Sequence, residues 1–245
     1  MTYHPYTSNG NCKTLSEVRT DVGTIATAGY KLVRIYGTDC NSVTNVLAAV
    51  KERGLRIFIT ISSLSDVDAQ TAIIISATNG DWNNLDTVAV GNELVSTRVS
   101  TVSQVIAATN SVRTKLRASG YAGSVVTVDD IATIKSNPTL CTNSDYCAIN
   151  IQPYYAGIAA STTGTYIKSQ VTALQSVVGT TKSIVITEVG WPKQGAAIGS
   201  AVPSAASQKV AIAAVKTSFT SSVIFFEAFD SFWAAQAVDR SWGIL

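Results

Sequence analysis

Two glutamates in this chain occupy positions from which carboxylates often do chemistry. Glu93 ends an apolar run that begins at Thr87, and Glu188 ends a second apolar run that begins at Ser183. A parallel strand buried on both faces is a nearly continuous apolar run, so a carboxylate at its last position has apolar surroundings behind it and a cleft in front. Two carboxylates placed in this way predict a site that cleaves carbohydrates.

The segments that would position these glutamates recur along the whole chain. Eight strand-like segments alternate with helical stretches, and no linker or low-complexity segment divides them. This alternation predicts an α/β fold, a single (β/α)8 TIM barrel that forms one catalytic domain over residues 1–245. The expected strands are a short one at Met1–His4 and others at Lys31–Gly37, Arg56–Ile61, Thr87–Glu93, Ser124–Asp130, Tyr146–Gln152, Ser183–Glu188 and Val223–Asp230.

The expected helices begin with recognisable capping signals. Thr14 and Glu17, three residues apart, form a capping box at the first helix. The helical signals are weaker after Ser63 and after Val128. The five clearer helices are expected at Leu15–Ala28, Ser42–Arg53, Ser100–Ser119, Thr165–Val178 and Ser204–Ser218.

Composition narrows the classes of partner. The chain has 245 residues, a net charge of +2 and only 14% charged residues, so it offers no basic patch of the kind that nucleic acid requires. No apolar run approaches the roughly 18 residues that span a bilayer, so we expect no membrane partner. The start at Met1 lacks the charged and apolar regions of a signal peptide, and earlier removal of such a signal is one explanation that remains open. We also expect a monomer.

Four cysteines form an even set whose spacing matches no zinc or redox motif, so we expect neither a metal nor a cofactor. Spacing alone allows three disulfide pairings, and four reduced, buried cysteines are the alternative. Cys12 and Cys40 each follow a strand-like segment, and neighbouring loops at one end of the barrel could bring them together, which would leave Cys141 with Cys147. Disulfides and few charges favour a secreted or cell-wall setting.

The active site of such a barrel lies at the carboxyl ends of its strands. The residues expected there are polar or aromatic, and they include His4, Arg34, Tyr36, Asp39, Asn92, Glu93, Asp129, Asp130, Asn150, Gln152, Tyr154, Tyr155, Glu188, Trp191, Glu227 and Asp230.

Three motifs in this set resemble a known family. Val90–Glu93 (VGNE), Thr187–Pro192 (TEVGWP) and Val33–Cys40 (VRIYGTDC) are similar to motifs of glycoside hydrolase family 17 in its fungal branch, and the likeness extends through nearly the whole chain. Members of that branch act on β-1,3-glucan. The resemblance implies that Glu93 is the general acid/base and Glu188 the nucleophile of a retaining mechanism. Partial burial and mutual repulsion would raise the pKa of Glu93, while hydrogen-bond donors would keep Glu188 charged.

The resemblance also implies a set of substrate-binding residues. Asn92 would hold the sugar 2-hydroxyl, where a hydrogen bond that strengthens in the transition state raises the rate. Aromatic side chains would stack on glucose rings, and acidic or amide side chains of the cleft would bind hydroxyl groups. The set is Tyr36, Asp39, Asn92, Asn150, Tyr154, Tyr155, Trp191, Glu227, Asp230 and Trp233.

The chain departs from the family pattern at two positions near the expected sugar sites. Gln152 stands where fungal relatives usually have histidine, and Ala234 stands where a lysine often follows the tryptophan. Both changes leave the two glutamates unaffected, but they bear on substrate preference.

Three functions remain open at this point. The leading prediction is a retaining endo-β-1,3-glucanase. The alternative is a β-1,3-glucanosyltransferase, in which a sugar hydroxyl rather than water resolves the glycosyl-enzyme, and the third is a non-catalytic glucan-binding protein of the cell wall. For Arg34 and Asp39 a structural salt bridge is the alternative to a substrate contact, and His4 is expected to be a packing residue rather than a catalyst.

Overall fold

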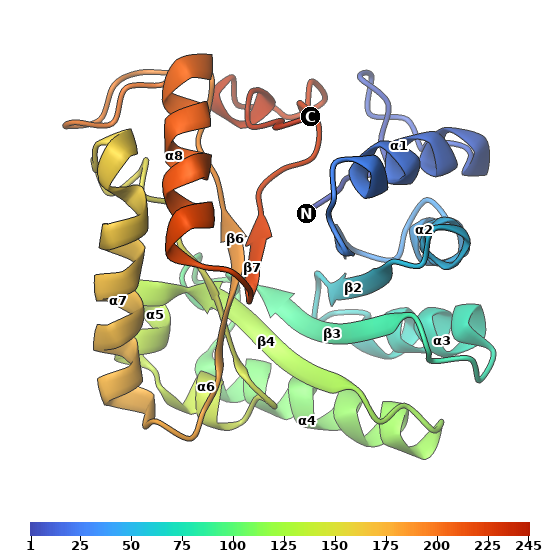
Figure 1. Cartoon of the computed structure of the whole chain (residues 1–245). Helices are drawn as coiled ribbons and strands as arrows, with labels where there is room; N and C mark the ends of the chain where they lie inside the picture. Colours follow the sequence, from blue (N-terminus) through green and yellow to red (C-terminus); the bar gives the residue numbers. More distant parts are fainter.

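The computed structural model describes residues 1–245, which fold into a parallel sheet that curves into a barrel (Figure 1). Neighbouring strands along the chain are also neighbours in the sheet, so every connection is a parallel crossover. The strands are β1 (Leu32–Tyr36), β2 (Arg56–Ile61), β3 (Leu85–Asn92), β4 (Ser124–Asp130), β5 (Cys147–Asn150), β6 (Ile184–Val189) and β7 (Val223–Phe225).

The N-terminal residues close the barrel between β7 and β1. Thr2 forms a parallel bridge with Arg34, and its backbone N–H donates to the carbonyl of Phe225 on β7 at 2.9 Å. On the same side, the N–H of Ala228 donates to the carbonyl of Thr2. The short strand expected at Met1–His4 therefore fills the eighth position, and the predicted (β/α)8 barrel is confirmed.

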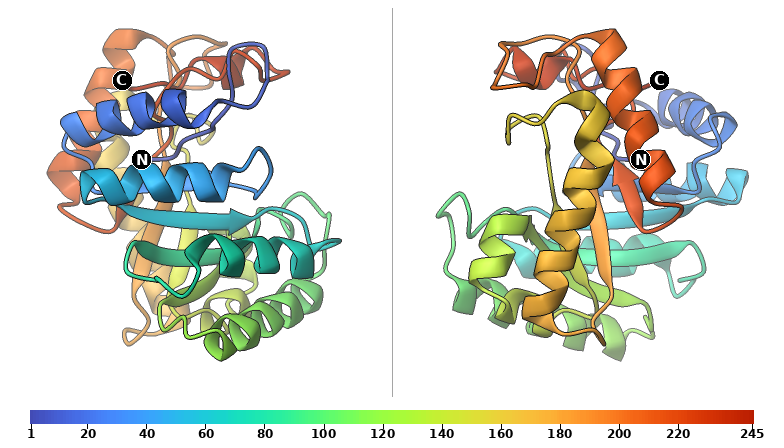
Figure 2. Two further views of the ribbon diagram at one scale, coloured as in Figure 1. Left: turned by 90° about the vertical axis from the view of Figure 1, so that its right-hand side faces the viewer. Right: turned by 60° about the vertical axis from the view of Figure 1, so that its left-hand side comes forward.

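Helices cover the outside of the barrel, and Figure 2 shows the last two long ones, α7 and α8, side by side. The capping box predicted at Thr14 and Glu17 is present at the first helix, and a second one, Thr101 with Gln104, begins the helix after β3. The helices are α1 (Leu15–Thr27), α2 (Ser42–Arg53), α3 (Val67–Thr78), α4 (Val102–Ala118), α5 (Ile131–Ser136), α6 (Thr139–Thr142), α7 (Thr163–Val178) and α8 (Ala205–Ser218).

The core has two layers because successive residues of a strand face opposite sides of the sheet. Outward-facing residues such as Ile57, Val88 and Ile149 pack with the helices in the larger cluster. Inward-facing residues form a separate small cluster inside the barrel, which consists of Phe58, Ala89, Val126, Val128, Ala148 and Ile224.

The last strand is shorter than predicted. The sequence favoured a strand over Val223–Asp230, but β7 ends at Phe225. Beyond it the backbone of Glu227 and Ala228 bonds to the C-terminal tail, since the N–H of Ile244 donates to the carbonyl of Glu227 at 3.0 Å. The apolar run Val223–Phe229 therefore continues as an irregular segment that holds the tail.

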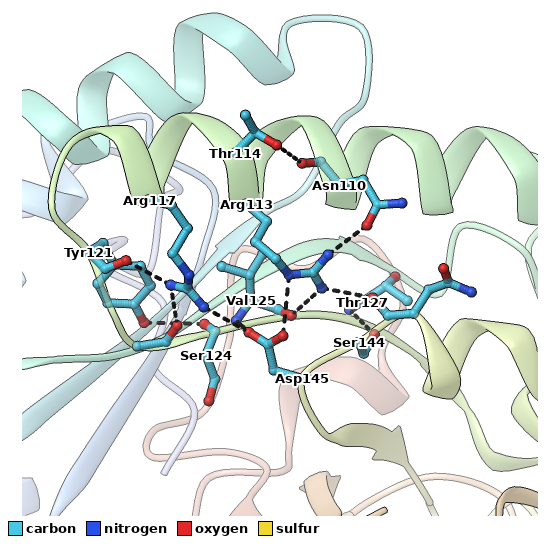
Figure 3. Close-up of polar contacts among 12 residues, drawn as sticks. Asn110, Arg113, Thr114, Arg117, Tyr121, Ser124, Val125, Thr127, Ser144 and Asp145 are labelled. Atoms are coloured by element: carbon cyan, nitrogen blue, oxygen red, sulfur yellow. Dashed lines mark hydrogen bonds and ion pairs between the residues drawn. The ribbon is translucent and has the colours of Figure 1, made fainter.

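A polar network fixes α4 at the end of the barrel opposite the carboxyl ends of the strands (Figure 3). Asp145, just before β5, forms ion pairs with Arg113 at 3.3 Å and Arg117 at 3.2 Å, and it accepts from the N–H of Val125 at 2.7 Å. These ion pairs and hydrogen bonds have a structural role, because they join α4 to the starts of β4 and β5.

Two disulfides are formed, Cys12–Cys40 and Cys141–Cys147, and no cysteine is free. The pairing favoured by the position of the loops is thus confirmed. Among the helices, none combines the length and apolar character needed to cross a bilayer.

Candidate active site

Glu93 directly follows β3, at a place where the backbone turns sharply. Gly91 has φ +83° and Glu93 has φ +58°, and the pairing of β3 with β4 shifts register between Ala89 and Asn92. The positive φ favours glycine at position 91, and a Cβ there would also lie 2.8 Å from Leu94 Cδ1, so a larger residue would be strained. The turn redirects the chain so that Glu93 faces the mouth of the barrel.

The carboxylate of Asp129 stabilises the loop that carries Glu93. It accepts hydrogen bonds from the N–H groups of Val95 at 3.0 Å and Asp130 at 2.9 Å. Asp130 caps α5 through the N–H groups of Ala132 and Thr133, and it also lines the cleft. Asp129 therefore supports the loop that carries Glu93, and Asp130 both caps a helix and forms part of the cleft wall.

Glu188 lies on β6 and is surrounded by donors. Its Oε1 accepts from Arg34 Nη1 at 3.0 Å and from the Tyr36 hydroxyl at 2.6 Å. Burial raises the pKa of Tyr36 well above its ordinary value, so this hydroxyl stays protonated and donates. Two donors, one of them charged, stabilise the ionised form of Glu188.

Arg34 is the counter-charge of the site, and its side chain is 0% exposed. Besides Glu188, it donates to Asn92 Oδ1 at 2.8 Å and to the carbonyl of Thr187 at 2.9 Å. The guanidinium also lies over the ring of Phe58, 5.0 Å from the centroid. Of the two roles considered for Arg34, the structure supports the ion pair.

Asn150 joins the two carboxylates. Its Nδ2 donates to Glu93 Oε1 at 2.8 Å and to Asn92 Oδ1 at 3.1 Å, while its Oδ1 accepts from the Thr187 hydroxyl at 2.9 Å. Arg34 Nη1 also approaches Asn150 Oδ1 at 3.4 Å. A continuous chain of hydrogen bonds therefore runs from Glu188 to Glu93.

The two carboxylates differ in electrostatic environment. Burial and the nearby charge of Glu188 raise the pKa of Glu93 from 4.5 to about 7, although the hydrogen bond from Asn150 opposes the rise. Glu188, by contrast, contacts a guanidinium and a hydroxyl. Near neutral pH the pair can therefore hold one protonated and one ionised carboxyl group, which general acid catalysis with a carboxylate nucleophile requires.

The cleft has two arms that meet at Glu188 and Phe226. The arm with Glu93 has a volume of about 580 Å³. The other has a volume of about 520 Å³. The first is lined by Glu93, Asp130, Asn150, Gln152, Tyr155, Tyr166, Asp239 and Trp242 among others, and the second by His4, Tyr6, Gly10, Tyr36, Asn92 and Trp233.

Five of the predicted substrate-binding residues line these arms. Asn150 and Tyr155 lie in the first arm, and Tyr36, Asn92 and Trp233 lie in the second. Tyr155 is 52% exposed, so one face of its ring is open to a ligand.

Two of the predicted stacking platforms are buried instead. Trp191 is 0% exposed and Tyr154 is 2% exposed. Both pack with Trp242 of the C-terminal tail, and the Tyr154 hydroxyl donates to the carbonyl of Ala196 at 2.6 Å. Neither ring offers a face to a sugar, so both act in packing beneath the cleft.

The three remaining carboxylates of the predicted set bond to the protein itself. Asp39 accepts from the hydroxyl of Tyr6 at 2.7 Å, and Asp230 pairs with Lys193 at 2.8 Å. Lys193 thus links the loop after β6 to the segment after β7. The third carboxylate, Glu227, is buried beside His4.

Several residues of the cleft wall were not among the predicted substrate contacts. His4 and Tyr6 follow the first strand segment, and Asp239 and Trp242 come from the C-terminal tail. His4 ends the short strand, and this position was a signal for the site. Nothing local in the sequence marks the tail as part of the cleft. No group of three or more histidine, cysteine, aspartate or glutamate side chains is arranged to hold a metal ion.

Comparison with known proteins identifies the family. A family profile described as the BtgE/BtgC glycoside hydrolase domain matches residues 1–243. The chain belongs to this glycoside hydrolase family. Among its relatives is the probable family 17 glucosidase SCW10 of Saccharomyces cerevisiae, which is 38% identical over 251 residues. The family match and this relative place the glycoside hydrolase in the fungal branch of family 17, as the motifs predicted.

A second relative shows the extent of the likeness. The cell surface mannoprotein MP65 of Candida albicans is 36% identical over 250 residues. The glycoside hydrolase chain is covered completely in both matches, but it spans only 64% and 65% of the length of these two curated relatives.

Solved structures show the same fold. The family 17 β-1,3-glucanosyltransferase of Rhizomucor miehei matches with a TM-score of 0.86 at 21% identity. An active-site mutant of that enzyme in complex with laminaritriose matches with a TM-score of 0.87 at 20% identity, over all of this chain and 91% of that one.

Proposed function

We propose that this glycoside hydrolase domain cleaves internal β-1,3-glucosidic bonds of β-glucan with retention of configuration. One observation carries the proposal: two carboxyl groups line a single cleft and have opposite environments, Glu93 with a raised pKa and Glu188 with a guanidinium and a hydroxyl donor. Family membership supports this assignment of the pair.

The two glutamates would act in two steps. In the first, ionised Glu188 attacks the anomeric carbon while protonated Glu93 gives its proton to the leaving oxygen, which forms a covalent glycosyl-enzyme. In the second, Glu93 removes a proton from water, and the hydroxide attacks the anomeric carbon and releases Glu188. A pKa of about 7 for Glu93 suits both tasks near neutral pH.

Asn92 is oriented to bind the sugar at the reacting centre. Both Arg34 and Asn150 donate to its Oδ1, which leaves its Nδ2 free for a ligand. The Nδ2 group would donate to the sugar 2-hydroxyl, where hydrogen bonds contribute most in the transition state. The second carboxamide, Asn150, would keep Glu93 in place.

The two arms suggest how the polymer lies. The sugar that is attacked must contact Glu188 and Asn92, so it occupies the arm with Tyr36 and Trp233. The leaving sugar must reach Glu93, so it occupies the arm with Tyr155. Because the cleft continues on both sides of the carboxylates, a bond inside a chain can be bound, which favours endo-cleavage.

A β-1,3-glucanosyltransferase is the second candidate. The leaving-group arm is roomy, at about 580 Å³, and has the open ring of Tyr155 beside Glu93, so a second sugar can replace water as the acceptor. A fold shared with the Rhizomucor miehei glucanosyltransferase is consistent with this activity. The two disulfides, together with a cell surface mannoprotein among the relatives, favour action outside the cell or in the cell wall.

Product analysis on laminarin and on short β-1,3-gluco-oligosaccharides tests the proposal. We expect Glu93→Gln and Glu188→Gln to lose activity, and Glu52→Gln, an exposed glutamate paired with Arg19 on the surface, to retain it. With an activated aryl glucoside, azide should restore turnover of the Glu93→Gln variant and give a β-glycosyl azide. Full activity in either variant would refute the assignment.

The same assay separates hydrolysis from transfer. Products longer than the substrate indicate transfer, and Tyr155→Ala should lower their yield relative to hydrolysis because the acceptor loses its platform. An inactive parent that still binds glucan would instead indicate a glucan-binding protein.

A further inference from the structure

The chain has a single histidine, His4, and it lies in the wall of the arm that also contains Tyr36 and Trp233. Its ring stacks on Tyr36, with centroids 4.8 Å apart and planes 10° from parallel. The edges of Trp233 and Phe226 meet it at 5.2 and 6.3 Å. Three aromatic rings therefore hold the imidazole in place, and one of them is Tyr36, whose hydroxyl donates to Glu188.

One edge of the imidazole is bonded to a buried carboxylate. His4 Nδ1 lies 2.9 Å from Glu227 Oε2, which also accepts from the Ser231 hydroxyl at 2.8 Å. Glu227 is only 1% exposed, and its Oε1 has no hydrogen-bond partner. When the ring donates to this carboxylate its hydrogen is on Nδ1, which leaves Nε2 with a free lone pair.

The other edge of the imidazole is free. No group of the protein bonds to Nε2, and the His4 side chain keeps 15% of its surface exposed. Nδ1 faces the buried carboxylate, so the exposed edge is the one that contains Nε2, and it faces the cavity. A polar nitrogen that is held rigidly in the wall of a cleft and has no partner in the protein can form a hydrogen bond with a bound ligand.

We propose that His4 Nε2 binds a hydroxyl group of the glucan in this arm, and that Glu227 is a positioning residue that acts through His4. This inference rests on the proposed function. It also gives a reason for a carboxylate that is buried with one oxygen unpaired, because such a group is costly unless it holds a partner in place. Glu227 would thus bind no sugar directly, in contrast to the role first expected for it.

The single histidine allows a direct test by nitrogen NMR. The Glu93→Gln variant, labelled with ¹⁵N-histidine, is titrated with laminaripentaose, because loss of the acid/base prevents turnover while the arm around His4 is unchanged. We expect the free protein to show the hydrogen on Nδ1. We expect sugar to shift the Nε2 signal while the Nδ1 signal, held by Glu227, stays in place. A hydrogen on Nε2 in the free protein, or an Nε2 signal that does not respond at saturation, would overturn the inference.

Kinetics provide a second readout that a purely structural role would not move. His4→Asn keeps a donor near the position of Nδ1 but removes the Nε2 end, so KM for laminaripentaose should rise about 3- to 10-fold, as for the loss of one hydrogen bond, with a small change in kcat. Glu227→Gln should raise KM similarly, and the double variant should be no worse than His4→Asn alone. Additive losses, or a lower Tm with unchanged KM, would overturn the positioning role.

Failure of this inference and failure of the proposed function look different. If the parent does not cleave β-1,3-glucan at all, the proposed function fails. If the parent cleaves it while the Nε2 signal and the KM of His4→Asn stay unchanged, only the role of His4 fails.

Discussion

Glu93 should make the folded protein less stable at alkaline pH, and Glu93→Gln should remove this effect. The pKa of Glu93 rises from 4.5 to about 7 on folding, chiefly because the side chain is buried and lies near Glu188. A carboxyl group with a raised pKa binds its proton more tightly in the folded state, so its favourable contribution is present at acidic pH and is lost as the pH rises through 7. Above pH 7 the folded state must hold an ionised carboxylate in unfavourable surroundings.

The size of the stability effect follows from the size of the pKa change. At about 1.4 kcal/mol for each pKa unit, the rise corresponds to roughly 3 kcal/mol. Glu93 is partly exposed, and water screens part of this energy, so we expect Glu93→Gln to raise the free energy of unfolding by about 1 to 2 kcal/mol at pH 8. At pH 4 the protonated Glu93 of the parent is uncharged, like the glutamine of the variant, so the difference in unfolding free energy between the two proteins should vanish.

Urea unfolding of the parent and Glu93→Gln at pH 4 and pH 8, with both disulfides intact, measures this difference. Glu52→Gln on the surface is the matched control and should show no such trend. An equal stability difference at the two pH values would refute the electrostatic reasoning. The same pKa predicts an alkaline limb near pH 7 in kcat/KM, because the acid must be protonated in the free enzyme.

Two further predictions concern the support of the site. Arg34→Met should lower the free energy of unfolding by roughly 3 to 5 kcal/mol and kcat by about 100-fold or more, because it leaves Glu188 without its buried counter-charge. Urea unfolding and steady-state kinetics measure the two effects, and a variant that is as stable and as active as the parent would contradict the prediction. Replacing both Cys12 and Cys40 by serine should lower the free energy of unfolding by about 2 to 4 kcal/mol and raise KM, since this disulfide anchors loops beside the cleft. Removal of the Cys141–Cys147 disulfide, at the opposite end of the barrel, should reduce Tm without changing KM. Equal effects of the two disulfides on KM would rule out that anchoring role.

The sequence predicted those features that depend on local patterns. Apolar runs mark the buried strands of a parallel barrel whatever their partners are, so the strand positions and both glutamates followed from them. The capping box at Thr14 and the start of α2 at Ser42 also followed from residues within a few positions. The resemblance to family 17 then assigned the roles.

The missed features depend on contacts between residues far apart in the chain. Trp191 is buried in a cluster that includes Trp242 of the C-terminal tail, and β7 ends where the same tail bonds to Glu227. The pairing of His4 with Glu227 joins residues 223 positions apart. No local pattern contains such information, so aromatic residues near the cleft could not be divided into exposed and buried ones beforehand.

The closure of the barrel by its N-terminal residues has a consequence for folding. Thr2 bonds to Phe225 and Ala228, while its neighbours Met1 and Tyr3 bond to Arg34 of β1, so the earliest part of the domain to be synthesised completes its pairing only with one of the last. The N–H of Leu245 also bonds to Ala228, beside the bond from Ala228 to Thr2, and the two ends lie near each other (Figure 1). Closing a loop of more than 200 residues is entropically costly until the strands between are in place, so the ends should join late and the barrel should fold as one cooperative unit. Joining the two ends into a cyclic backbone should therefore speed folding, whereas a circular permutant would only move this long-range closure to another pair of strands.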